Sequence, residues 1–316
     1  MHTLDRASPW KSTLAATVAC LIFGASTVAT RFAVAQTTPV VLAFLRYAIA
    51  TTCVLAVLRR AAFPPMAVRD RVQVGLLGVL FFGIFPWSFS ASLTHLPSTQ
   101  VALIVATNPL VTLALSRLRG LEQITPTALV GQLLAFGGLA LALPPIHTPG
   151  VPALPPDAWL GYVEAGVTVL CGALYNVWSR PLLLRHGPLA ITAQSMAAGA
   201  LALAPLALAD GLPEHLRTVT VGGWGAVLFL GTLGGALAFG LWTWALHRST
   251  PSRVAVFLAL NPVTAIALGV TLLGEPLGWR LLCGLGAVLV GIQLATRGRS
   301  VPAAAALSRS TRRAAG

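Results

Sequence analysis

Long apolar runs separated by short polar gaps form the dominant pattern along this chain. A helix needs about 20 residues to cross roughly 30 Å of hydrocarbon, and ten runs have about that length. They are Thr13–Val34, Thr38–Val57, Val74–Leu93, Ser98–Leu115, Thr125–Leu143, Trp159–Ser179, Pro188–Leu208, Val221–Leu246, Pro251–Leu273 and Leu277–Ala295. The pattern predicts an all-α integral membrane protein with ten transmembrane helices.

Two of these runs share one motif, which indicates an internal duplication. VALIVATNPLVTLAL, from Val101 to Leu115, returns as VAVFLALNPVTAIAL, from Val254 to Leu268. Asn108 and Asn261 are therefore equivalent, at an offset of 153 residues. The same offset relates three further pairs, which are Glu122 and Glu275, Gly131 and Gly284, and Gly138 and Gly291.

The cations predict how the two halves sit in the bilayer. Seventeen of the 21 Lys and Arg residues fall in the termini and in the gaps on one side, whereas only Arg217 and Arg280 lie on the other. Because cytoplasmic loops carry an excess of Lys and Arg, both termini are predicted to be cytoplasmic. A unit of five spans ends on the side opposite its start, so the halves are predicted to be inverted five-helix repeats.

The predicted organisation has five parts. They are a cytoplasmic N-terminus at 1–12, a first repeat at 13–143 with spans one to five, an external linker at 144–158, a second repeat at 159–296 with spans six to ten, and a disordered cytoplasmic tail at 297–316. The linker is rich in proline and contains no Lys or Arg, which is typical of an external connector.

Composition excludes most soluble classes of protein. The chain is 56% hydrophobic and 9% charged, with a mean hydropathy of +0.81, whereas soluble domains are about one quarter charged. The net charge of +13 does not indicate nucleic-acid binding, because the cations lie in short gaps between apolar runs. The four cysteines lie inside apolar runs without metal-ligand spacing, so no metal site and no cofactor are predicted.

The Asn-Pro pairs are the first candidates for a substrate cavity. Pro109 and Pro262 fall near the middle of their spans, and each removes a backbone N–H and so interrupts its helix. Interrupted helices in inverted repeats are typical of the binding sites of secondary transporters. Asn108 and Asn261 would place matched amides at that depth. The alternative is a pair of packing kinks whose asparagines bond neighbouring helices.

Three ionisable residues fall within predicted spans, where charges are costly and often functional. At 1.5 Å per residue, Arg46 would lie about 12 Å and Glu164 about 8 Å below the external ends of their spans. They could form a structural pair or handle substrate or protons, and both readings stay open. Arg31 would lie within about 5 Å of the external end, where its side chain could reach the interface.

Aromatic and amide side chains at interior depth are further candidates for lining a cavity. They are Trp87, Tyr175, Asn176, Gln194 and Trp242. A buried indole or phenol needs a polar partner, and such rings also suit a planar or cationic solute. Ordinary packing and interfacial belts are the alternative explanation.

Glu122 and Glu275 occupy matched junctions between a loop and a helix. An acid at that position complements the helix dipole, so both are predicted to be caps. Glu275 with Pro276 is predicted to start span ten.

The chain resembles the EamA-type family of the drug/metabolite transporter superfamily at four places. They are IFGASTVATRFA from Ile22 to Ala33, LAFLRYAIA from Leu42 to Ala50, the two Asn-Pro segments, and LLGEPLGWRLLCGLGAVLVGI from Leu272 to Ile292. The first half departs from the family pattern, because Gly120, Leu121 and Glu122 replace an adjacent Gly-Glu pair. Arg31 stands where relatives often have lysine. The resemblance implies a cavity built from spans one, three, four, six, eight and nine, and export of amino acids, metabolites or drugs.

Together these features predict a secondary transporter that exports a small molecule across a bacterial cytoplasmic membrane by alternating access. Its predicted partners are the small-molecule substrate and the lipid bilayer, and transport is either coupled to protons or downhill. The alternatives are a lipid flippase or scramblase, and an importer of the same fold. An enzyme is not predicted, because Glu164 is the one acid well inside a span and the six histidines lie in loops or tails. The oligomeric state is not predicted.

Overall fold

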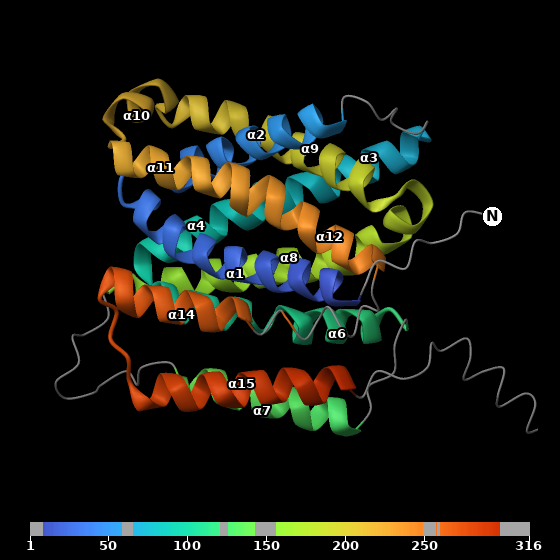
Figure 1. The fold of residues 1–316 in the computed structure, drawn as a ribbon, viewed down its shortest axis with the longest axis vertical. Helices are drawn as coiled ribbons and strands as arrows, with labels where there is room; N and C mark the ends of the chain where they lie inside the picture. Colours follow the sequence, from blue (N-terminus) through green and yellow to red (C-terminus); the bar gives the residue numbers. More distant parts are fainter. Residues whose placement is uncertain are drawn as a thin grey trace, which may run out of the picture.

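The computed structural model describes residues 9–58, 66–120, 126–142, 156–248, 257 and 260–297. All regular secondary structure within these residues is helical (Figure 1). Most of the predicted linker (residues 144–155), the tail beyond residue 297, Glu122 and most of the first part of span nine lie outside the described residues.

The helices divide into two series along the chain. The first half contains α1 (Pro9–Val34), α2 (Pro39–Leu58), α3 (Val68–Gly78), η1 (Val79–Ile84), α4 (Phe85–His95), α5 (Ser98–Val105), α6 (Asn108–Leu118) and α7 (Pro126–Ala142). The second half contains α8 (Ala158–His186), α9 (Pro188–Ala209), α10 (Leu212–Thr218), α11 (Val221–Phe229), η2 (Leu230–Leu237), α12 (Ala238–Arg248), α14 (Leu260–Leu273) and α15 (Trp279–Arg297).

Seven helical segments of the described chain are long and apolar enough to cross a membrane. They are Trp10–Val34, Pro39–Val57, Val68–His95, Ser98–Leu118, Ala158–Leu183, Leu189–Ala209 and Val221–Trp242. Three shorter apolar segments lie at Leu129–Ala142, Leu260–Leu273 and Trp279–Leu294. The chain is therefore a helical membrane protein with several spans, and the exact number of ten stays a prediction.

Two π-helical segments, which the sequence analysis missed, occupy similar places in the two halves. η1 joins α3 to α4, and η2 joins α11 to α12. Glycines let both segments pack closely against a helix of the other half. A Cβ on Gly199 of α9 would lie 2.6 Å from the Phe82 backbone in η1, and a Cβ on Gly231 of η2 would lie 2.6 Å from the Ile49 Cβ in α2.

The last helices of the two halves, α7 and α15, form an antiparallel pair. Gly138 lies against Gly284, where a Cβ would be 2.8 Å from the opposing carbonyl oxygen, and Gly291 lies against Gly131 at 2.5 Å. As the residue number falls in α7 from Gly138 to Gly131, it rises in α15 from Gly284 to Gly291, which establishes that the helices run in opposite directions. Figure 1 shows the pair side by side at one edge of the bundle.

The bundle has two ends, which we name after an acidic residue at each. The Glu275 end holds the α1–α2, α4–α5, α9–α11 and α14–α15 connections, on the left in Figure 1. The Asp70 end holds the start of α3 and the α8–α9 connection, on the right. The predicted start of span ten was wrong, because α15 begins at Trp279 and the preceding residues from Glu275 are not helical.

Candidate functional site

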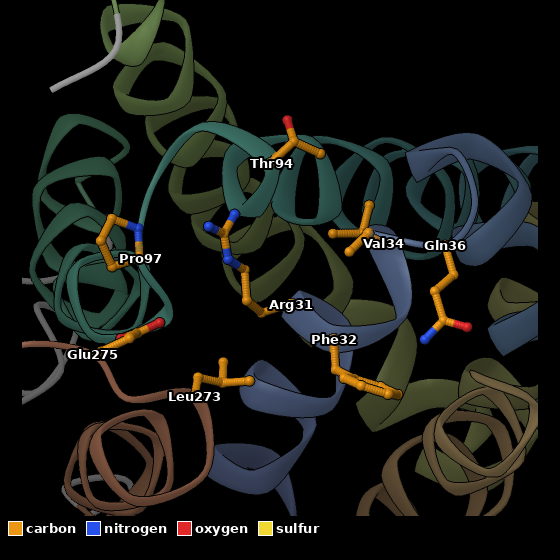
Figure 2. Close-up of a pocket in the computed structure, with 9 residues that line it drawn as sticks. Arg31, Phe32, Val34, Gln36, Thr94, Pro97, Leu273 and Glu275 are labelled. Carbon is orange, nitrogen blue, oxygen red and sulfur yellow. The ribbon is translucent and has the colours of Figure 1, made fainter. Parts of the chain in front are cut away.

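A cavity of about 570 Å³ lies at the Glu275 end, beside α1 and the α4–α5 and α14–α15 connections. Its walls are formed by Arg31, Phe32, Val34, Ala35, Gln36, Thr94, Pro97, Leu273 and Glu275. Figure 2 shows Arg31 entering from α1 and Glu275 from the α14–α15 connection. A cation and an anion from different halves therefore face one cavity.

Both charges hold the corner between α4 and α5. The Arg31 guanidinium donates to the carbonyl of Leu93, near the C-terminus of α4. The Glu275 carboxylate accepts hydrogen bonds from the backbone N–H groups of Ser98 at 2.7 Å and Thr99 at 2.9 Å, at the N-terminus of α5. A cation at a helix C-terminus and an anion at an N-terminus both complement the helix dipole. Glu275 is a cap, as predicted, but it caps a helix of the other half.

The first Asn-Pro segment interrupts its span. α5 ends at Val105, and α6 begins at Asn108 after a turn at Ala106 and Thr107. Pro109 occupies the first turn of α6, where its missing N–H costs no helical hydrogen bond. The break that the sequence predicted in this span is present.

The Asn108 amide is bonded to α8 and to its own helix. It donates to the Val169 carbonyl at 3.0 Å and accepts from Asn176 at 3.0 Å and from the Thr112 hydroxyl at 3.3 Å. Gly172 makes room for it, since a Cβ there would lie 2.3 Å from the Asn108 Nδ2. Asn108 and Asn176 are thus brought together, as members of one cross-half network.

The second Asn-Pro segment has the equivalent location in its own half, near the start of a helix, but its hydrogen bonding differs. α14 begins at Leu260, one residue before Asn261, and Pro262 is buried. A Cβ on Gly24 of α1 would lie 2.6 Å from the Asn261 backbone oxygen. The Asn261 side chain makes no hydrogen bond to any described residue, and it is only partly buried.

The structure places Tyr175 in an aromatic cluster. Its ring stacks on Phe81, with centroids 4.3 Å apart, and meets the edge of Phe82 at 5.9 Å. Phe239 of α12 contacts both phenylalanines, at 6.3 and 5.7 Å. The phenylalanines were missed in the sequence, although Phe81 and Phe82 form an adjacent pair in the middle of a span.

None of the asparagine, proline, aromatic and amide candidates predicted to line a cavity is among the residues that border the cavity at the Glu275 end. Trp87 is 41% exposed. Trp242 packs beside Ala16 and Ala245, where α12 meets α1. Gln194 of α9 is partly buried.

Arg46 and Glu164 do not form the pair that was considered. Arg46 is about nine-tenths buried, its guanidinium lies 5.4 Å from the Tyr47 ring centre, and its Nε has no hydrogen-bond partner among the described residues. Glu164 instead approaches His95, with Oε2 3.9 Å from Nε2.

A cluster at the Asp70 end joins the two halves and was not predicted. The buried Asp70 of α3 accepts from the Arg185 Nη1 at 3.0 Å and contacts the His186 Nε2 at 2.7 Å, both at the end of α8. Asp70 and its two partners are far apart in sequence, so only the fold brings them together.

Comparison with known proteins places this geometry in a family. The profile of the EamA-like transporter family matches residues 10–143 and again residues 159–297. An uncharacterized transporter of Archaeoglobus fulgidus is 27% identical over 283 residues, which cover 88% of this chain and 95% of the relative. The uncharacterized inner membrane transporter YedA of Escherichia coli K12 is 26% identical over 283 residues, 88% of each chain.

A relative with a more specific name is a probable terminal-alkyne amino-acid exporter of Streptantibioticus cattleyicolor. It is 24% identical over 229 residues, which cover 72% of this chain and 74% of the relative. A solved crystal structure superposes with a TM-score of 0.67 at 22% identity, covering 92% of this chain and 98% of that one. That likeness shows the fold.

Proposed function

The chain belongs to the EamA-like transporter family, and from this membership we propose that it is a secondary transporter exporting a small organic solute by alternating access. Members of the family are transporters, so the chain is a transporter and not an enzyme, as predicted. The mechanism, the direction and the solute are the proposed part.

The packing of α7 on α15 supports two inverted repeats. The offset of 153 residues converts Gly131 into Gly284 and Gly138 into Gly291. Two contacts are observed, one between Gly131 and Gly291 and one between Gly138 and Gly284. Replacing each glycine by its equivalent in the other half converts the first contact into the second. Equivalent helices that meet in an antiparallel, self-complementary way are what a two-fold axis in the membrane plane produces.

The observation that carries the proposal is the exchanged docking of the Asn-Pro segments. Asn108 in the first half lies against Gly172 of α8, the first helix of the second half. Asn261 in the second half lies against Gly24 of α1, the first helix of the first half. Each helix start therefore sits at the interface between halves, where secondary transporters bind their solutes.

The described cavity lies at one end of the bundle, and a buried cluster that joins the two halves lies at the other. The cavity at the Glu275 end is bordered by Arg31 and Glu275. At the Asp70 end, Asp70 ties α3 to α8 through Arg185 and His186. We interpret this form as open toward the Glu275 end and closed at the Asp70 end.

The distribution of cations supports an external Glu275 end in a bacterial inner membrane. Arg217 and Arg280 are placed on that side, whereas Arg69, Arg71 and Arg185 are on the other. The name of YedA as an inner membrane transporter agrees with this location. Cysteines introduced by Pro213→Cys and Val68→Cys test it, with the parent as the reference because its Cys283 is exposed. A membrane-impermeant maleimide added to intact cells should label P213C above the level of the parent and V68C only at that level. The reverse labelling would invert the proposed orientation.

Export of amino acids or related solutes is favoured by the name of the Streptantibioticus relative, a probable amino-acid exporter. An importer of the same fold would show the opposite preferred direction.

Flux into proteoliposomes tests the proposed function. The purified full chain is reconstituted and given a panel of labelled amino acids, organic cations and aromatic drugs, with empty liposomes and the Val221→Ala variant as controls. Val221 is 91% exposed, so V221A should transport as the parent does. We expect saturable flux of at least one solute. A fluorescent-lipid assay runs in parallel, and lipid movement without solute flux would replace the proposal with a lipid flippase or scramblase.

A further inference from the structure

Three titratable side chains meet where α4 ends and α8 begins. The His95 Nδ1 lies 3.0 Å from the Asp157 Oδ2, and the His95 Nε2 lies 3.9 Å from the Glu164 Oε2. One imidazole therefore stands between two carboxylates. Glu164 lies in α8 of the second half and Asp157 directly precedes that helix, whereas His95 ends α4 of the first half, so the contact crosses the interface between halves.

The spacing along α8 explains why His95 reaches both acids. Asp157, Gly161 and Glu164 are separated by four and three residues, which places them on one face of the helix. Gly161 lies between the acids, and a Cβ there would be 2.8 Å from the His95 Cβ. The glycine thus lets the end of α4 sit directly on α8, with its imidazole between the carboxylates.

Exposure falls from one carboxylate to the other. The Asp157 side chain is 54% exposed, whereas those of His95 and Glu164 are 21% and 25% exposed. The Glu164 Oε2 itself is buried and has no hydrogen-bond partner among the described residues. A carboxylate oxygen left in this state is costly, and binding a proton or receiving one from His95 relieves that cost. Within the described residues no three such groups converge on a point that could hold a metal ion.

We propose that Asp157, His95 and Glu164 form a proton-binding site through which the transporter couples solute movement to a proton from the medium at the Glu275 end. The coupling rests on the proposed function. A proton from the medium binds the His95 Nε2 while the Nδ1–H donates to Asp157. The Nε2–H bond then breaks as an O–H bond forms on the Glu164 Oε2, which leaves a neutral imidazole and a neutral carboxyl group.

Three other polar side chains on the surrounding elements have partners of their own. The Tyr162 hydroxyl of α8 donates to Gln100 of α5 at 3.1 Å. Arg31 of α1 is bonded to the Leu93 carbonyl, and Glu275 to the start of α5. Among the described residues, the titratable cation that approaches Glu164 is therefore His95.

Two measurements test the site, with Glu164→Gln as the main variant. Glu214→Gln is the matched control, because Glu214 is an exposed acid at the same end of the bundle with no side-chain contact to His95. The first measurement follows the histidine ring nitrogens by NMR in the full chain labelled with ¹⁵N-histidine, with His95 assigned by His95→Gln. We expect the pH dependence of the His95 signals to change in E164Q, because the imidazole loses its neighbouring carboxylate, and to match the parent in E214Q.

The second measurement uses proteoliposomes and the solute found in the flux panel. In E164Q we expect accumulation driven by a pH gradient to fall to the level without a gradient. Exchange of labelled for unlabelled solute, which needs no net proton movement, should stay within about two-fold of the parent. Accumulation equal to the parent's would overturn the coupling, and an unmoved His95 titration would overturn the site. If the parent moves no solute, the proposed function and the coupling fail together, and the NMR titration alone decides whether the site binds a proton.

Discussion

The two Asn-Pro segments have equivalent positions in the two halves, yet they use their asparagines differently. Each segment lies at the start of a helix and presses against a glycine in the first helix of the other half. The Asn108 side chain makes three hydrogen bonds. The Asn261 side chain makes none to the described residues, and this segment meets Gly24 with its backbone oxygen. The duplication has kept the backbone arrangement and not the role of the amide.

The sequence left two explanations open for these asparagines, which are lining a cavity and bonding neighbouring helices. The difference in bonding favours a different explanation for each asparagine. A helix interrupted in hydrocarbon needs neighbouring protein or cavity water for its freed backbone groups. Close docking on a glycine brings a helix of the other half against both segments. The amide of Asn108 is occupied in tying α6 to α8. The amide of Asn261 makes no hydrogen bond to a described residue, so we infer that it is the one of the pair that contacts solute.

The largest effect is expected from Gly24→Ala. The added Cβ would lie 2.6 Å from the Asn261 backbone oxygen and 2.6 Å from the Thr264 Cβ. Neither atom can move without shifting the start of α14, so we expect a loss of about 1–3 kcal/mol in the free energy of unfolding. A denaturant titration of the purified chain in mixed micelles measures it. Gly166→Ala is the control, because a Cβ there meets nothing within 4 Å, and equal stability of the two variants would contradict the close contact.

Much of this arrangement could be predicted because it is local or periodic in the sequence. Apolar runs gave the membrane helices, and the repeated motif gave the matched positions of Asn108 and Asn261. The proline in each motif predicted a break, and the first half has one, between Val105 and Asn108.

The rest depends on contacts between distant residues. Glu275 looked like a cap for the next helix, but it binds Ser98 and Thr99, 177 and 176 residues away. No local sequence pattern shows whether Glu275 caps the next helix or a distant one, because a carboxylate complements any nearby helix N-terminus. The fold decides which one it reaches. In the same way Glu164 looked available to Arg46, and the packing of α4 on Gly161 gave it His95 instead.

Asn108→Ala should cost less than Gly24→Ala but more than the matching change at Asn261. It removes three hydrogen bonds, and bonds of this kind in membrane proteins average about 0.6 kcal/mol each. We therefore expect a loss of roughly 1–2 kcal/mol in the same titration. A stability equal to that of Asn261→Ala would remove the structural distinction between the two asparagines.

Gly172→Ala tests the comparison further, because the group that its added Cβ would meet is a side chain and not backbone. The added Cβ would lie 2.3 Å from the Asn108 Nδ2, so the amide must leave its place and give up its bonds. In an Asn108→Ala background the obstacle is absent, and adding Gly172→Ala should cost less than in the parent. We expect a coupling of about 0.5–1 kcal/mol in a double-mutant cycle. Gly24→Ala paired with Asn261→Ala should show no such relief, since the obstacle there includes backbone, and additivity in both cycles would refute the proposed difference.

The smallest change in stability is expected for Asn261→Ala, within about 0.5 kcal/mol of the parent, as for substitutions that break no contact. Its effect should appear in transport instead. One lost hydrogen bond to the solute is worth about 1 kcal/mol, so the solute concentration that gives half-maximal flux should rise about five-fold. Asn108→Ala should lower flux mainly in proportion to the folded protein that remains. Asn261→Ala should therefore change the half-maximal concentration and Asn108→Ala the amount of folded protein. An Asn261→Ala protein that transports with the parent's half-maximal concentration would show that Asn261 does not touch the solute.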